Sequence, residues 1–131
     1  SKDKYEIEEE NYDYVIKAIK NALVKSLDSK QMEKEADKIK ISGNKVNVTK
    51  YSYTIDEKTL KNMVKDMAER LAEDKEFIKK TAKLSGVDKE EVEDALKELK
   101  KEAKDIELDK KIVINLYSKG FLIYWHEYRI C

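Results

Sequence analysis

The stretch "KIKISGNKVNVTKYSYTIDEKTL", residues 38–60, decides how the chain begins to fold. Two runs in which apolar and polar residues alternate lie on either side of Gly43 and Asn44. A two-residue loop of this kind between alternating runs is a strong signal of a β-hairpin. Because the side chains of a strand alternate between two faces, the pairs set by that loop fall on one face. The expected pairs are Ile41 with Val46 and Ile39 with Val48.

The second strand of this hairpin is expected to continue to Ile55, with Tyr51, Tyr53 and Ile55 on one face. Asp56 then ends the strand and caps a helix, because an aspartate at this position accepts a hydrogen bond from the first turn. After Asp56 the spacing of apolar residues changes from two to three and four, which is typical of an amphipathic helix. The apolar stripe of that helix comprises Leu60, Met63, Val64, Met67, Ala68 and Leu71.

The region before the hairpin predicts one more helix. Residues 1–10 are polar without a clear period, and we interpret them as a flexible lead-in. An apolar face at helical spacing follows, and the stretch around Met32 and Ala36 is expected to be a turn or loop. The residues of that face are Tyr12, Val15, Ile16, Ile19, Ala22, Leu23 and Leu27.

Two further helices are expected after residue 71. The first holds Phe77 and Ile78 inward and stops near Gly86, a residue that often ends helices. The second begins at Asp88, with Glu91 completing a capping box. The lysine-rich runs on these helices, such as "KKEAK" at residues 100–104, are interpreted as solvated faces.

The chain ends in a second hairpin, in which residues 111–117 and the stretch "GFLIYWHEYRIC", residues 120–131, form the two strands. The terminal strand is apolar on both faces, so we expect its outer edge to meet another chain. The alternative is that an earlier strand of the same chain, residues 38–42 or 45–55, covers that edge and closes the sheet internally. A three-residue loop predicts the pairs Leu116 with Leu122, Ile114 with Tyr124, Val113 with Trp125 and Lys111 with Glu127.

Length and charge limit the classes of protein to consider. The 131 residues are expected to form a single α+β domain, an antiparallel sheet of two hairpins packed against three to four amphipathic helices. Lys plus Arg and Asp plus Glu both number 28, and this balance argues against nucleic-acid binding and against an electrostatic membrane anchor. No apolar run approaches the roughly 20 residues of a membrane span, so no transmembrane segment is expected in this chain.

One resemblance adds to this reading. "NKVNVTKYSYTIDEKTLKNMV", residues 44–64, and "KIVINLYSKGF", residues 111–121, resemble a family of uncharacterised lipoprotein-like proteins of Gram-positive bacteria. That family is similar to the half-barrel lipoproteins of the LolA and LppX type, in which an antiparallel sheet curls around helices and leaves an apolar groove. The resemblance implies export, an upstream lipid anchor and extracytoplasmic residence. On this basis the chain is expected to be a fragment of, or shortened relative to, a longer exported protein.

No residue pattern predicts catalysis, a cofactor or a metal. His126 and Glu127 are neighbours on a strand and point to opposite faces, and Cys131 is too far along the strand to use His126 as a base. The spacing of acidic residues in "DIELD", residues 105–109, resembles the start of a calcium loop. However, that loop needs a glycine and a distal glutamate, which are absent here. We therefore expect a protein that is not an enzyme.

Aromatic residues on the predicted strands are the candidates for ligand contact, although packing of the sheet is the commoner role for such residues. We expect a binding or structural module of the bacterial envelope that holds a lipid or other apolar ligand in a groove between sheet and helices. The alternative is a protein-interaction domain that forms a homodimer through the terminal strand. The groove candidates are Tyr51, Tyr53, Tyr117, Tyr124, Trp125 and Tyr128.

Overall fold

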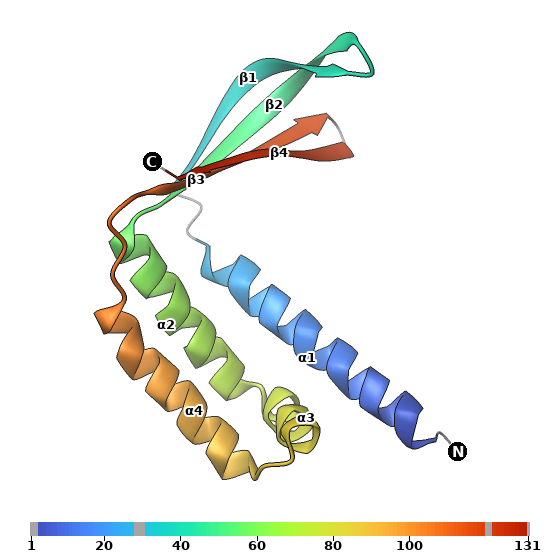
Figure 1. The fold of residues 1–131 in the computed structure, drawn as a ribbon, viewed down its shortest axis with the longest axis vertical. Helices are drawn as coiled ribbons and strands as arrows, with labels where there is room; N and C mark the ends of the chain where they lie inside the picture. Colours follow the sequence, from blue (N-terminus) through green and yellow to red (C-terminus); the bar gives the residue numbers. More distant parts are fainter. Residues whose placement is uncertain (1–2, 28–30, 120–121, 131) are drawn as a thin grey trace. The chain divides into compact units, whose positions relative to one another are not determined.

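The computed structural model describes residues 3–27, 31–119 and 122–130, the last of these by their backbone alone. The fold class is α+β, as predicted, with helices and an antiparallel sheet (Figure 1). In chain order the elements are α1 (Lys4–Ser26), β1 (Met32–Ile41), β2 (Asn44–Ile55), α2 (Glu57–Glu73), α3 (Lys75–Ser85), α4 (Lys89–Glu102), the 3-10 helix η2 (Ala103–Asp105), β3 (Ile112–Lys119) and β4 (Leu122–Ile130).

The chain divides into two compact units. The helical unit combines Ser1–Leu27 with Leu60–Ile106, and the sheet unit combines Asp28–Thr59 with Glu107–Cys131. Helix α2 begins in the sheet unit and continues into the helical unit. Whether the two units make up the single domain expected from the length stays a prediction.

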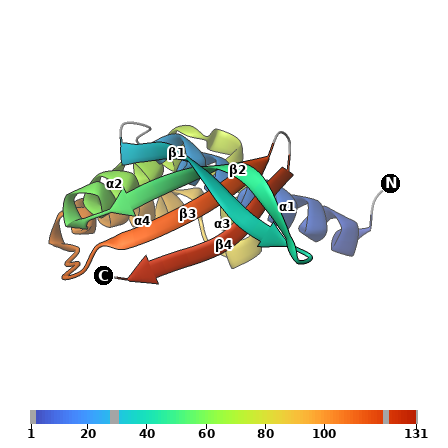
Figure 2. The ribbon, with the colours of Figure 1, turned by 90° about the horizontal axis from the view of Figure 1, so that it is seen from above.

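Within the described residues, the sheet is antiparallel and has four strands in the order β1-β2-β3-β4 (Figure 2). The first hairpin is confirmed, but its predicted register is wrong by two residues. Ile41 pairs with Asn44 and Ile39 with Val46, so the loop consists of Ser42 and Gly43. Both loop residues have positive φ, 51° and 81°, which is the backbone geometry of the hairpin turn that matches the twist of the strands.

Strand β1 is longer than predicted. The turn or loop expected around Met32 and Ala36 is wrong, because β1 already begins at Met32 and pairs with β2 over its whole length. Its first half is charged rather than apolar, so alternation of hydrophobicity could not reveal it. Strand β1 is at the edge of the sheet, where charged residues are tolerated and protect the edge from unwanted pairing.

Strands β2 and β3 join the two hairpins. Tyr53 lies opposite Ile114 and Tyr51 opposite Leu116, so these residues share one face of the sheet, with Ile55 and Ile112 continuing the row. The predicted face of the second strand is thereby confirmed. On the other face, Ser52 lies opposite Asn115.

The second hairpin is confirmed as an antiparallel pair, but the predicted pairs are wrong. Strand β3 continues to Lys119, which lies opposite Leu122, so the connection is two residues long and not three. An irregularity between Asn115 and Leu116 shifts the register by one more residue. As a result Leu116 pairs with Trp125, Ile114 with Tyr128 and Val113 with Arg129. Lys111 precedes β3, and Glu127, its predicted partner, lies opposite Asn115.

Helix α1 begins earlier than predicted. The flexible lead-in over residues 1–10 is wrong from Lys4 onward, where the helix starts; residues 1 and 2 lie outside the described part. Asp3 is the N-cap, and its Oδ1 accepts a 2.8 Å hydrogen bond from the backbone N–H of Glu6. Acidic residues near a helix N-terminus are favoured by the helix dipole, so the glutamate-rich start stabilises a helix without an apolar period.

Capping residues fix the helices that follow. Asp56 Oδ1 accepts a 2.8 Å hydrogen bond from the Thr59 N–H at the start of α2, which confirms the predicted cap. Helix α3 ends at Gly86, whose φ of 68° is left-handed. The N–H of Val87 donates to the carbonyl of Ala82, and the N–H of Gly86 donates to that of Lys83, which together satisfy two carbonyls of the last turn.

The predicted capping box at α4 is wrong. Asp88 is the N-cap, but its side chain makes no capping hydrogen bond. Its backbone carbonyl instead accepts from the N–H groups of Glu91 and Val92. The start of α4 is therefore defined by backbone geometry, with acidic residues in the first turn that suit the helix dipole.

The core of the helical unit gathers side chains from all four α-helices. Val15 and Ala18 of α1 pack beside the buried cluster, whereas Tyr12 and Ile16 on the adjoining face of the same helix are 58% and 46% exposed. The apolar face predicted for α1 is thus only partly a core face. The buried cluster comprises Ala22, Leu71, Phe77, Ile78, Ala82, Val92 and Leu96.

One polar contact joins α1 to α3 within this unit. The Tyr14 hydroxyl donates to both carboxylate oxygens of Asp74, at 3.1 and 3.2 Å, while Asp74 Oδ1 also accepts from the N–H of Phe77 as the N-cap of α3. Desolvation, followed by the hydrogen bond to Asp74, raises the pKa of Tyr14. Lys80 lies with its ammonium 5.0 Å from the Tyr14 ring centroid.

Candidate functional site

The aromatic groove candidates do not all lie on one face of the sheet. Tyr51 and Tyr53 are on the same face, where Tyr53 is buried and Tyr51 half-buried. The ammonium of Lys34, the β1 residue opposite Tyr51, lies 6.0 Å from the centroid of that ring. Tyr117 is buried as well, but it pairs with Lys50 and therefore belongs to the opposite face. Sequence reasoning did not separate these faces when it grouped the tyrosines.

The other three candidates are described only by their backbone. Tyr124, Trp125 and Tyr128 lie on β4, in register with Tyr117, Leu116 and Ile114 respectively. The predictions made for their side chains, and for that of His126, lie outside the described side chains. Cys131 lies outside the described residues altogether.

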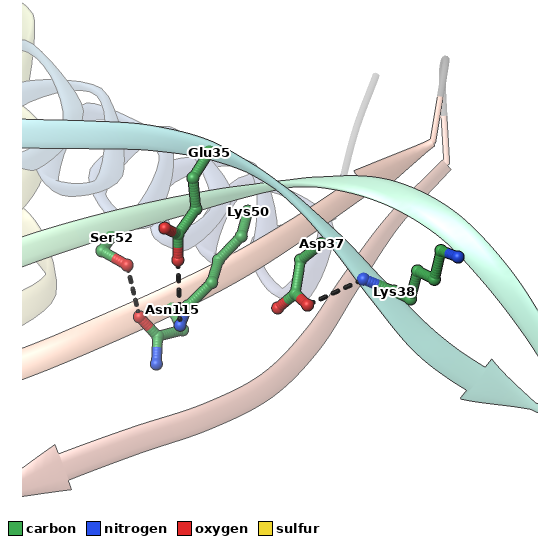
Figure 3. A network of polar contacts seen from close by, with 6 residues as sticks. All are labelled: Glu35, Asp37, Lys38, Lys50, Ser52 and Asn115. Atoms are coloured by element: carbon green, nitrogen blue, oxygen red, sulfur yellow. Dashed lines mark hydrogen bonds and ion pairs between the residues drawn. The ribbon is translucent and has the colours of Figure 1, made fainter.

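A polar network occupies the Tyr117 face of the sheet, and sequence reasoning missed it (Figure 3). The Ser52 hydroxyl donates a 2.7 Å hydrogen bond to Oδ1 of Asn115, which is only 6% exposed. Next to this pair, the Lys50 ammonium lies 3.6 Å from a carboxylate oxygen of Glu35. Each pair is a direct cross-strand pair, so the network links β1, β2 and β3.

The signal for this network was present in the sequence. Ser52 and Asn115 are polar residues on strands that were expected to alternate between an apolar and a polar face, and a buried amide requires a partner. What the sequence could not supply was the register of β2 against β3, which brings these two residues together. The network has the composition of a structural brace, because it contains no nucleophile paired with a base.

The acidic residues expected to be solvated are not gathered into a site. No group of three or more His, Cys, Asp or Glu that could hold a metal occurs in the part of the chain that the structure describes. Asp56, the cap of α2, is a carboxylate whose pKa departs from its ordinary value. Its pKa is lowered, first by the backbone N–H and then by the side chain of Thr59. That shift reports a helix cap rather than a reactive group.

Glu57 ties the start of α2 to the segment before β3. Its Oε1 accepts a 3.0 Å hydrogen bond from the backbone N–H of Leu108, within the sheet unit. A backbone N–H of the "DIELD" segment, residues 105–109, therefore anchors this segment to α2 through the Glu57 side chain. Among the described helices, none is long and apolar enough to span a bilayer.

The outer edge of β4 is the feature of the sheet unit with the clearest capacity for interaction. In the described residues β4 has a strand neighbour on one side only, so the backbone groups along its other side have no strand partner. The opposite edge of the sheet, β1, has six charged residues among ten, whereas the sequence of β4 has two charged residues among nine. The two edges therefore differ in the protection that charge gives against pairing.

No protein-family model, curated protein or solved structure matches this chain. The resemblance to lipoprotein-like proteins of Gram-positive bacteria therefore stays a prediction.

Proposed function

We propose that this chain is a non-enzymatic interaction module that forms a homodimer by pairing β4 with β4 of a second copy. The observation that carries the proposal is the open outer edge of β4 in a sheet with the linear order β1-β2-β3-β4. An unprotected edge of this kind is a template for another strand. A second copy is the partner we favour, because a two-fold axis between the β4 strands of the two copies makes one antiparallel sheet of eight strands from two identical edges.

Backbone pairing and burial of apolar surface would drive this association. The strand sequence "LIYWHEYRI" is rich in aromatic and β-branched residues, which favour strand pairing. The contrast with β1, "MEKEADKIKI", supports β4 rather than β1 as the paired edge, because alternating charges disfavour edge-to-edge contact. Balanced charge over the chain also keeps long-range repulsion between copies small.

Light scattering under reducing conditions tests the dimer over roughly 10 μM to 1 mM, the range in which a weak edge contact would populate. We expect the mass to rise toward that of a dimer, and amides along β4 to exchange more slowly at high concentration. Ile123→Lys should weaken the association because it adds a charge to the edge strand. The matched control, Met32→Lys on β1, should leave the association unchanged. A strict monomer at all concentrations would rule out this function.

Binding of an apolar ligand is a second candidate, favoured by one face of the sheet. Tyr51, half-buried, shares that face with Tyr53, Ile114 and Leu116, which provides adjoining aromatic and aliphatic surface. Together with the family resemblance, this apolar surface supports a lipid as the ligand. The resemblance also supports a full-length protein that is exported and held at the membrane by a separate lipid attached upstream. Native mass spectrometry of protein purified from cells should then show bound lipid.

A fluorescent fatty acid gives a sharper test of this second candidate. Its affinity should fall in Tyr51→Ala and stay unchanged in Tyr12→Ala, a control that removes an exposed tyrosine of the helical unit. Equal affinity of both variants would exclude the tyrosine face as the binding surface. Radioactive palmitate added to cells that express the full-length gene product tests the lipid anchor, and absence of label would remove that part of the proposal.

A further inference from the structure

A groove lined with lysines lies between α2 and α4 of the helical unit. Its volume is about 620 Å³. Lys61, Asn62 and Lys65 line it from α2, and the remaining lining residues come from α4 and η2. We call it the lysine groove. Its lining from α4 and η2 comprises Lys97, Lys100, Lys101, Ala103 and Lys104.

The antiparallel arrangement of two helices creates this groove. Helices α2 and α4 lie side by side (Figure 1), with the first half of α2 next to the end of α4. Farther along the same two helices, a second groove is lined by Glu69 and Glu73 as well as by Lys97 and Lys100. The lining of the lysine groove is therefore more basic than that of its neighbours, because a third groove at the same end of the helix pair includes Glu102 and Asp105. Ala103, which is 2% exposed, is the one apolar residue in the lining of the lysine groove.

The charge of the lysine groove is unbalanced. Six ammonium groups line it and no carboxylate does. Lys100 is paired at 3.0 Å with Glu69, which lines the neighbouring groove, and Lys61 takes part in a further interaction. The pairs Lys61/Lys65 and Lys97/Lys101 are each four residues apart on a helix. Like charges at this spacing destabilise a helix, although Glu57, Glu69 and Glu93 stand four residues from Lys61, Lys65 and Lys97 and offset this effect.

The helix dipole accounts for only half of the pattern. Lysines at the end of α4, such as Lys100 and Lys101, are stabilised by the negative end of that helix. Lys61 and Lys65 lie in the first half of α2, where the dipole gives cations no such stabilisation. In a chain with equal numbers of acidic and basic residues, a groove built from lysines on both helices indicates a preference for an anion.

We propose that the lysine groove binds a polyphosphate group, meaning two or more linked or neighbouring phosphates on one small molecule or lipid headgroup. Lysine ammonium groups bind phosphate as mobile point charges, and several of them around one groove match a ligand with several negative charges. The groove has lysines and no arginine, which favours compact, highly charged phosphates over the planar carboxylates that arginine recognises by paired hydrogen bonds. Its volume is in the range of small-ligand pockets.

Inorganic tripolyphosphate is the probe for the first test, titrated into the full chain at low ionic strength by calorimetry. We expect saturable binding that weakens as salt is added, because exposed charge interactions are screened. The variant Lys65→Gln with Lys101→Gln removes one lysine from each side of the groove and should weaken binding about tenfold. The control Lys79→Gln with Lys89→Gln makes the same change in net charge at exposed positions outside the groove. It should change the affinity less than about twofold.

A second arm identifies the source of the phosphates. Binding of the protein is measured to three kinds of vesicle. The first is phosphatidylcholine alone, the second adds a bisphosphorylated inositol lipid, and the third adds phosphatidylserine to the same total charge as the second. Groove-dependent binding to the inositol lipid vesicles supports a lipid headgroup, and groove-dependent binding to tripolyphosphate alone supports a soluble ligand. The proposal is overturned if neither tripolyphosphate nor the inositol lipid vesicles bind, or if both double variants lose affinity equally. It is also overturned if a long single-stranded DNA, titrated as a third probe, is the only one of the three that binds. Unchanged far-UV circular dichroism of each variant shows that lost binding is not lost folding.

Discussion

Truncation of Leu71 to alanine tests whether the cluster around α2 and α3 is the core of the helical unit. Leu71 is 6% exposed and packs in the cluster with Phe77, Ile78 and Leu96. The matched variant is Leu99→Ala on α4, because the leucine at position 99 is 43% exposed and lies outside that cluster. Both substitutions remove the same atoms, and alanine is a good helix former at both positions.

The expected loss follows from burial. Removing the three outer carbons of Leu71 costs about 0.8 kcal/mol for each buried methylene-sized group, or about 2.5 kcal/mol in total. The cavity left among its neighbours adds to this value, so we expect a loss of about 3–4 kcal/mol, within the range measured for buried leucines. The half-exposed side chain of Leu99 should lose about 1 kcal/mol or less.

Urea unfolding followed by circular dichroism measures both losses. The midpoint should fall much further for Leu71→Ala than for Leu99→Ala, with the slope of the transition unchanged in both variants. For a chain of this size the melting temperature should fall by roughly 10 °C or more in Leu71→Ala. A loss below about 0.5 kcal/mol for Leu71→Ala, or equal losses in the two variants, would refute the assignment of this cluster as the core.

Three further predictions concern single polar or backbone groups. The hydroxyl of Thr81 is buried without a hydrogen-bond partner among the described residues. Thr81→Val should therefore raise the free energy of unfolding by about 1 kcal/mol, whereas Thr81→Ser should not. A loss of stability in Thr81→Val would show that the hydroxyl has a partner. Gly86→Ala should lower the free energy of unfolding by about 1 kcal/mol because alanine disfavours the left-handed φ of this position. No steric clash adds to this cost, since an added Cβ would meet no atom within 4 Å. Gly86→Asn should cost less, and thermal melts compare the two variants. The capping bond lowers the pKa of Asp56 in the folded state, so its stabilisation is present above the unfolded pKa of about 3.9 and disappears as the pH falls through the folded value. Asp56→Ala should therefore be less stable than the parent at pH 7, with the difference shrinking in acid, and a pH-independent difference would contradict the cap as its cause.

Local chemistry made some elements predictable from sequence and hid others. The alternation on both sides of residues 42–44 and the cap at Asp56 each determine structure within a few residues, and both are confirmed. Strand β1 was missed between Met32 and Asp37 because a charged edge strand shows no apolar alternation. Its pairing depends on contacts with β2, such as the ion pair between Glu35 and Lys50, which local sequence does not reveal.

Register was the least predictable property of the sheet. A hairpin loop two residues shorter or longer is compatible with the same alternation, so in such a case alternation predicts the face of a residue better than its partner. For the first hairpin the shift was two residues, which kept every side chain on its predicted face. For the second, the extension of β3 to Lys119 and the irregularity after Asn115 moved the pairs by three to four residues.

The lysine groove shows why a proposed binding site can be missed even when the helices that line it are predicted. Taken alone, Lys61 and Lys65 mark a solvated stripe on α2, and Lys97 and Lys101 mark another on α4. Such stripes are ordinary on exposed helices. Only the antiparallel packing of α2 against α4 brings the two stripes to the same groove, with Glu69 and Glu73 kept to the neighbouring one. Tertiary structure is therefore what distinguishes a solvated helix face from an anion site. The tripolyphosphate titration tests the charge imbalance of the groove and not the lysine content of either helix.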